Sequence, residues 1–364
     1  MSESLPAPRS RGMRGRRASS EDGAAVSDGA AFSLQDTWPL PSGWRVIGAR
    51  ELTEHILSVR FVALLLVLGM AGALAIYAVS GSLRDAASQI PQAPTGQIPV
   101  FPLLFTISPS IAGISGQQFP SFAGMVALLG PVLGIAFGFD AISSERSEGT
   151  LPRLVSQPIY RDDVINGKFV AGLAVISMIL AAVILLLAGV GIIRLGIVPD
   201  GDIVMRLAAW FAVAVLYVAF WLALATLASV VFRRAATAAL VVIAIWLILT
   251  FFGSQIVSLL AGIISPVSSD STSTQQLANA QLAAELGRLS PITLFTEMTQ
   301  ALLNPLVQSL DPYFQDPTGR ALPTLLPFGQ SLLLIWPQVV TMVAGTVICF
   351  AAAYISFMRQ EVRA

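Results

Sequence analysis

The stretch that decides the fold is a charged segment between two long apolar runs. Residues 139–169 read FDAISSERSEGTLPRLVSQPIYRDDVINGKF and carry nine charged side chains. None of the 19 residues before Phe139 and none of the 24 residues after Phe169 is charged. A charge at the centre of a bilayer costs on the order of 3 kcal/mol, so uncharged runs of this length are typical of membrane-spanning helices. The pattern therefore predicts two spans joined by a polar loop in water.

The composition of the whole chain supports a membrane protein. Of its 364 residues, 55% are hydrophobic and 12% are charged, against roughly 25% charged residues in soluble domains. The apolar residues form six uncharged blocks, each about as long as the ~20 residues that cross a bilayer. These blocks are 61–83, 121–139, 169–193, 207–232, 235–265 and 331–358. Because a helix satisfies its own backbone hydrogen bonds in lipid, we predict an all-α polytopic membrane protein with six transmembrane helices.

The distribution of basic residues predicts which ends face the cytoplasm. If the N-terminus is cytoplasmic, the cytoplasmic segments hold 16 of the 21 Lys and Arg residues. Those segments are 1–60, 140–168, 233–234 and 359–364. Because loops rich in Lys and Arg stay in the cytoplasm, we expect both termini and the charged segment to be cytoplasmic. A seventh span over 98–114 would reverse this orientation, but that segment contains three prolines, and we interpret it as external or interfacial.

The N-terminal region divides into two parts. Residues 1–43 are rich in Arg, Ser and Gly, a composition typical of a disordered tail, here expected in the cytoplasm. Residues 44–58 alternate apolar and charged positions at near-helical spacing, which predicts a helix lying in the membrane interface. We place this helix at the start of a membrane domain over 44–364.

A long loop over 266–330 is expected on the extracytoplasmic side. Its sequence predicts one helix over about 274–286 and a second helix that follows directly. Ser290 is placed to cap the second helix, Pro291 suits its first turn, and Asn304 precedes a proline that ends it.

The residue inventory argues against catalysis and metal binding. His55 is the only histidine and Cys349 the only cysteine, so zinc sites of the Cys/His type and relays of several histidines are excluded. Residues 113–116 read GISG, which matches the motif of intramembrane serine proteases, but no other span supplies a histidine base. We interpret Gly113, Ser115 and Gly116 as loop or helix-end residues, and we expect no catalytic or metal site.

Nucleotide binding by this chain is also not expected. The only lysine, Lys168, follows a glycine in DDVINGKF, which distantly resembles a phosphate-binding loop. Such a loop needs glycine at position 162 and Ser or Thr at position 169, whereas the chain has Asp162 and Phe169. We therefore expect no cofactor site in the chain, and nothing in it indicates nucleic acid as a partner.

The second and fifth apolar blocks contain residues that are expected to affect how helices pack. Gly130, Gly134 and Gly138 recur every four residues, so they line one helix face that another backbone can approach closely. Pro131 lies among them and leaves a carbonyl group without its helical donor. This face is either simple packing within the chain or a seam that moves. Gln255 in the fifth block either bonds across helices or lines a path.

The charged segment is suited to a short helix on the membrane surface. Thr150 can cap such a helix and Pro152 fits its first turn. Its mixed charges favour a surface that receives a partner over a merely solvated loop. Several of its residues also resemble the pattern FD..S.ER..GTL..LL..P..R.....GK of the type-2 ABC-transporter permease family. The matching residues are Phe139, Asp140, Ser143, Glu145, Arg146, Gly149, Thr150, Leu151, Leu154, Pro158, Arg161, Gly167, Lys168 and Phe169.

The resemblance implies a role for the charged segment. In that family the segment forms a coupling helix that seats in a cleft of a separate ATPase subunit. The polar and glycine positions that it would assign to coupling are Asp140, Glu145, Arg146, Glu148, Gly149, Thr150, Arg153, Arg161 and Lys168. Residues 145, 146 and 148–150 would lie at or beside the ATPase contact. Two positions depart from the common pattern, since Pro152 replaces a helix former and Tyr160 replaces a capping serine.

The resemblance also implies a function. We expect the membrane subunit of an ABC exporter in a prokaryotic cell membrane, with ATP and Mg bound by a cytosolic ATPase subunit. Six spans are half of the usual twelve, so a second permease chain is expected in the complex. Membrane lipid is expected to surround it. One alternative is a non-transporting scaffold that passes ATP-driven motion to an external partner through loop 266–330. A weaker alternative is an intramembrane enzyme.

Overall fold

Helices make up all the regular structure in the residues that the computed structural model describes, which are 43–89, 100–108, 120–147, 160–196, 198–268, 271–304 and 326–359. These residues belong to the unit Pro41–Ala364. The helices are α1 (Gly43–Ile56), α2 (Val59–Gln89), α3 (Val100–Thr106), α4 (Phe122–Gly138), α5 (Ser143–Ser147), α7 (Arg161–Leu195), α8 (Gly201–Val231), α9 (Ala235–Leu247), η2 (Ile248–Phe252), α10 (Gly253–Ile264), α11 (Ser273–Gly287), α12 (Pro291–Leu303) and α13 (Phe328–Arg359). The tail predicted over 1–43 lies outside the described residues, apart from Gly43, which begins α1.

Six helical segments are long and apolar enough to cross a membrane, as predicted. They are Val59–Val79, Phe122–Ser147, Arg161–Arg194, Gly201–Val231, Ala235–Ile264 and Phe328–Arg359. The six-helix, all-α prediction is therefore confirmed for the described part of the chain. Of the segment 98–114, residues 100–108 are described, and they form the seven-residue helix α3, which by itself is too short to span.

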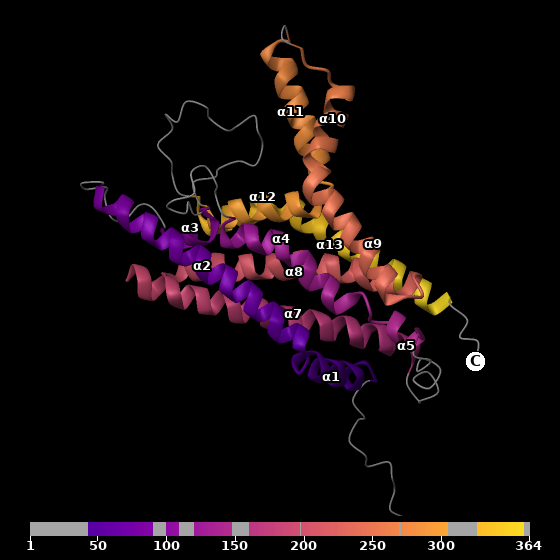
Figure 1. Ribbon diagram of the computed structural model, residues 1–364. Helices are drawn as coiled ribbons and strands as arrows, with labels where there is room; N and C mark the ends of the chain where they lie inside the picture. The colour runs from indigo at the N-terminus through magenta and orange to yellow at the C-terminus, as the bar shows by residue number, and fades with distance from the viewer. Residues whose placement is uncertain are drawn as a thin grey trace, which may run out of the picture. The chain divides into compact units, whose positions relative to one another are not determined.

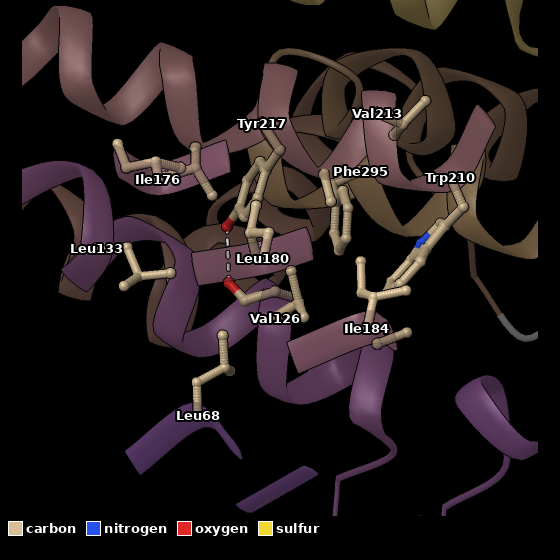
Figure 2. Close-up of a cluster of buried hydrophobic side chains, with 14 of the residues drawn as sticks. Leu68, Val126, Leu133, Ile176, Leu180, Ile184, Trp210, Val213, Tyr217 and Phe295 are labelled. Atoms are coloured by element: carbon tan, nitrogen blue, oxygen red, sulfur yellow. Dashed lines mark hydrogen bonds between the residues drawn. The ribbon is translucent and has the colours of Figure 1, made fainter. Parts of the chain in front are cut away.

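Helix α8 lies at the centre of the bundle, where it packs against α4, α7, α12 and α13 (Figure 1). Its aromatic side chains Trp210, Tyr217 and Trp221 are fully buried. Figure 2 shows how side chains from α2, α4, α7, α8 and α12 converge there, with Phe295 beside Tyr217. The rings of Tyr217 and Phe295 are stacked with their centroids 4.5 Å apart. Helix α8 therefore packs against helices from both the first and the last parts of the chain.

Tyr217 supplies a hydrogen bond to a carbonyl group of α4 that Pro131 leaves without its helical donor. Pro131 has no amide hydrogen, so the carbonyl of Ala127, four residues earlier in α4, loses its helical donor. The hydroxyl of Tyr217 donates to this carbonyl oxygen at 2.7 Å, and the bond is drawn in Figure 2. A side chain of α8 thus satisfies a polar group of α4 inside the apolar core, as a helix in lipid requires.

The region predicted as an external loop contributes a helix to the core. Helix α11 is capped by Thr272 and Gln275 and ends at Gly287, within one residue of the prediction. Helix α12 begins at Pro291 and buries Phe295, Met298 and Leu302 against the bundle. Ser290 occupies the N-cap position, but its side chain makes no capping hydrogen bond and is buried, so that detail of the prediction was wrong.

Arg206 anchors α12 to the bundle. Its side chain is 3% exposed, although it directly precedes the uncharged block 207–232. The guanidinium pairs with Asp202 at 2.6 Å and donates to the carbonyl of Leu302 at 3.2 Å and to the hydroxyl of Ser331 at 3.1 Å. It also donates to the carbonyl of Leu326. One arginine of α8 therefore holds the end of α12 and the start of α13 together.

Candidate functional site

The charged segment begins with the short helix α5 and continues into the first turns of α7. Asp140, Glu145, Arg146, Arg161 and Lys168 are among the described residues. The remaining predicted coupling residues lie outside them, and these are Glu148, Gly149, Thr150 and Arg153. Tyr160, which replaces a capping serine, precedes α7 without a side-chain capping bond.

Helix α5 is fixed to the end of α8 by a serine. The hydroxyl oxygen of Ser229 accepts the amide hydrogens of Ile142 at 2.9 Å and of Ser143 at 3.0 Å. The guanidinium of Arg146 donates to the carbonyl of Val230 at 3.3 Å. The two bonds to Ser229 satisfy buried backbone amides at the start of α5, which has too few residues to be stable alone. Helix α5 therefore depends on α8 for its position.

A small apolar core lies beneath α5. Ile142 is fully buried there with Ile165 of α7, Val230 of α8, and Ala353 and Phe357 of α13. The core brings four parts of the chain together at the end of the bundle that carries the charged segment. Movement of α5 is thus opposed by packing as well as by hydrogen bonds.

Lys168 joins three helices through two ion pairs. Its ammonium nitrogen Nζ lies 2.6 Å from Oε1 of Glu51 in α1 and 2.8 Å from Oε1 of Glu145 in α5. The side chains of Lys168, Glu51 and Glu145 are 9%, 16% and 14% exposed. Breaking a buried ion pair by removing one partner costs about 3–5 kcal/mol, far more than breaking an exposed pair. We call Glu51, Lys168 and Glu145 the ion triad.

A glycine next to Lys168 makes the ion triad possible. At Gly167 a Cβ atom would lie 2.9 Å from the carbonyl oxygen of Trp44 and 3.0 Å from Cβ of Ile47. On the other side of the crossing, a Cβ at Gly48 would lie 3.4 Å from the carbonyl oxygen of Gly167. The backbones of α1 and α7 therefore approach closely at this point. This close approach brings Glu51 within reach of Lys168. Gly167 thus allows the contact between the helices, and Lys168 next to it forms the ion pair across that contact.

A second group of contacts holds α1 and α2 to the end of α4. Arg60 pairs with Asp140 at 2.6 Å, with side chains 49% and 22% exposed, and its guanidinium lies over the ring of Phe139. The ring of His55 meets the edge of Phe137 at a centroid distance of 5.2 Å. Burial lowers the pKa of His55 below its usual value and so favours the neutral ring. Because the Arg60 pair is half exposed, its contribution to stability is small.

The glycine face of α4 lies against α8 of the same chain. At Gly134 a Cβ would lie 2.8 Å from the amide nitrogen of Leu222 and from the carbonyl oxygen of Val218. At Gly130 and Gly138 the added atom would lie 3.0 Å from Tyr217 and 2.8 Å from Ala225. Helices α4 and α8 are therefore in backbone contact, so a displacement of α8 acts directly on α4.

Gln255 faces outward from the described bundle. It lies on α10 just after the π-helical turn η2, and its side chain is exposed. Its Oε1 accepts the hydroxyl hydrogen of Ser254 at 2.9 Å. Gln255 is thus bonded to its neighbour on the same helix. Among the described residues, it forms no hydrogen bond to another helix.

Sequence reasoning missed part of this site. Glu51, Ser229 and Gly48 were not singled out, although each makes a contact that fixes the charged segment. The one available signal was the spacing of Ile47, Gly48 and Glu51, which places an acid on the face of α1 that packs against α7.

Comparison with known proteins gives a family for this arrangement. The family described as "ABC-2 family transporter protein" matches residues 45–362, a range that contains the six long helices, the ion triad and the charged segment. A search of curated proteins gives no significant match. The match covers most of the chain and agrees with the resemblance carried by the charged segment. The chain therefore belongs to the ABC-2 transporter family and is a multi-pass membrane protein, the transmembrane permease of an ABC transporter.

Proposed function

We propose that this chain is the permease subunit of an exporter driven by a separate cytosolic ATPase, with residues 140–168 as the docking segment. The ATPase would bind ATP and Mg, and the permease would supply the path across the membrane. The observation that carries the proposal is the ion triad, because Lys168 of α7 joins Glu145 of α5 to Glu51 of α1. A docking segment that only needed solubility would have no reason to bury Glu145 and Lys168 against a third charge.

The contacts of α5 suggest how motion would pass into the bundle. A push on α5 would act on α7 and α1 through Lys168, and on the end of α8 through Ser229. Helix α8 would pass the displacement to α4 across the glycine face. It would also act on the outer end of the bundle, where Arg206 holds α12 and α13. This sequence of contacts links the proposed docking segment to the opposite end of the bundle.

The sidedness and the membrane are part of the proposal. The distribution of basic residues supports cytoplasmic positions for both termini, for the ion triad and for the turn between α8 and α9. The outer end of the bundle, with α3, α11 and α12, would then face the exterior. We propose the cell membrane of a prokaryote as the location.

A second permease chain is also proposed. One face of α10 exposes Ile256, Leu259 and Ile263, and Gln255 lies on the same face. Apolar side chains alone would be compatible with lipid, but an exposed amide in the span is costly there. A second permease chain that covers this face would supply partners for Gln255. Two chains of six spans would give the twelve spans expected for a complete transporter.

The docking role can be tested at Arg146, which lies on α5. For Arg146→Ala we expect normal membrane insertion and capture of the cognate ATPase weakened by about 30-fold or more, since an unpaired charge at an interface costs about 2–5 kcal/mol. The measurement is ATPase pull-down by the purified variant, with the ratio of ATPase to permease chains determined in the same sample. Substrate flux in sealed vesicles then separates an exporter from a scaffold.

Arg50→Ala is the matched control. Arg50 is an exposed arginine of α1 whose partner, Glu54, is also exposed, with side chains 74% and 56% exposed. We expect this variant to capture the ATPase as the wild type does. Wild-type capture by Arg146→Ala, together with wild-type transport, would contradict docking at α5.

A further inference from the structure

The turn between α8 and α9 carries two arginines that the coupling contacts do not use. Residues 232–234 join the two helices, and both Arg233 and Arg234 are exposed. Among the described residues, neither side chain makes an ion pair or a hydrogen bond. Because α8 and α9 are both spans, a turn of three residues keeps these two charges where the apolar part of the membrane ends.

The charges around this turn are unbalanced. Arg146 donates to Val230, three residues before Arg233, and the positive charge of Arg233 repels that of Arg146. Two described acids close to α5 are already engaged, since Glu145 pairs with Lys168 and Asp140 pairs with Arg60. Asp162 and Asp163 lie in the first turn of α7, and among the described residues neither forms an ion pair with the turn. The turn therefore presents positive charge that no described carboxylate pairs with.

An apolar track leads away from the two arginines along the outer face of α9. Leu240, Ala244 and Leu247 are exposed and spaced so that they share one side of the helix. At about 1.5 Å per residue, the track runs from about 9 Å to about 20 Å from Arg234. One leaflet of the hydrocarbon layer is about 15 Å thick, so the track matches the reach of an acyl chain.

We propose that Arg233 and Arg234 bind the phosphate headgroup of an anionic phospholipid whose acyl chain lies along Leu240, Ala244 and Leu247. Guanidinium groups bind phosphate oxygens with charge-assisted, frequently bidentate hydrogen bonds. A lipid fits the site better than an acidic protein surface because the arginines lie at headgroup depth and the apolar track begins directly beside them. A bound phosphate would also offset the repulsion between Arg233 and Arg146 and so hold α5 in place. That last effect rests on the proposed docking function, whereas the binding itself does not.

The binding is tested on the purified full-length chain, without the ATPase. Native mass spectrometry in detergent would compare binding of dioleoylphosphatidylglycerol, which is anionic, with that of dioleoylphosphatidylcholine. An arginine at an anionic membrane surface contributes about fivefold in affinity, so R233Q/R234Q is expected to lose about 30-fold of the preference for phosphatidylglycerol. R233K/R234K should keep most of that preference. R45Q/R50Q removes the same charge from the exposed face of α1, where Arg50 is already paired with Glu54, and should lose less of the preference.

Several results would overturn the proposal. An unchanged preference in R233Q/R234Q would show that the turn does not bind the headgroup, and an equal loss in R45Q/R50Q would indicate only a general charge effect. Competition by inorganic phosphate at millimolar concentration would point to a site for free phosphate. If R233Q/R234Q keeps the lipid preference but loses capture in a separate ATPase pull-down, the turn is a protein-docking surface. Melting in phosphatidylcholine checks that every variant is folded.

Discussion

Gly134→Leu is expected to prevent stable folding of the bundle. The first atom of any side chain at this position would lie 2.8 Å from the amide nitrogen of Leu222, from the carbonyl oxygen of Val218 and from Cβ of Trp221. Two of these three atoms are backbone atoms of α8 and cannot rotate away. Overpacking a core costs about 1–3 kcal/mol even when side chains can yield, so we expect a loss above that range. The measurements are the amount of monodisperse protein in detergent and its melting temperature.

Gly189→Leu is the control for this prediction. Gly189 lies in α7, another span, and a Cβ there would meet nothing within 4 Å. Leucine is a better helix former than glycine by somewhat under 1 kcal/mol, so this variant should be as stable as the wild type or more stable. Gly130→Ala should be milder than Gly134→Ala, because its nearest neighbours at 3.0–3.1 Å are side-chain atoms of Tyr217 and Val218. Equal melting of Gly134→Leu and Gly189→Leu would contradict the backbone contact.

The number and type of helices could be read from the sequence because lipid penalises charge so strongly. Their ends could not be read in the same way. Helix α7 begins at Arg161, eight residues before the uncharged block, since a helix continues into water when its first turn suits it. Asp162 and Asp163 lie in that turn, where acids interact favourably with the helix dipole. Helix α2 likewise continues past Arg84 to Gln89. The edge of an apolar block thus marks where the chain passes from lipid to water, and the helix can continue beyond it.

The interruption of the fifth span was only partly visible. The sequence showed the polar residue Gln255 in the fifth block, but the π-helical turn lies before it, over Ile248–Phe252. A π turn depends on how neighbouring residues shift the hydrogen bonds of the helix, and no residue pattern in an apolar run specifies it. The position of α12 was hidden for a related reason. Its apolar face was predictable, but the partner of that face, at Trp210 and Tyr217 of α8, is defined only by the fold.

The candidate site shows the same limit. A local pattern pointed to Glu145 and Lys168, which are 23 positions apart within one charged segment. Glu51 was not visible, because it is 117 positions from Lys168 and belongs to another helix. The sequence can indicate that a lysine in an apolar region needs a counter-charge, but it cannot say which acid supplies it.

Lys168→Met is expected to destabilise the end of the bundle that carries the charged segment. Removal of the ammonium group leaves the carboxylates of Glu51 and Glu145 close together and largely buried, without the cation that both contact. The expected cost is about 3–5 kcal/mol, the range for breaking a buried ion pair. The measurement is thermal melting of the purified chain, together with ATP hydrolysis by the complex with its ATPase. Arg50→Met, which breaks an exposed pair, should cost no more than about 1 kcal/mol.

A triple variant, Glu51→Gln, Lys168→Met and Glu145→Gln, separates stability from coupling. Replacing a whole buried ion set by neutral side chains is often neutral or stabilising, so melting should return close to that of the wild type. Transport should stay impaired, because α5 would then lack the charged link that ties it to α1 and α7. Full recovery of transport along with melting would mean that the ion triad only stabilises the fold. If Lys168→Met alone melts at the wild-type temperature, the three charges are solvated and contribute little to stability.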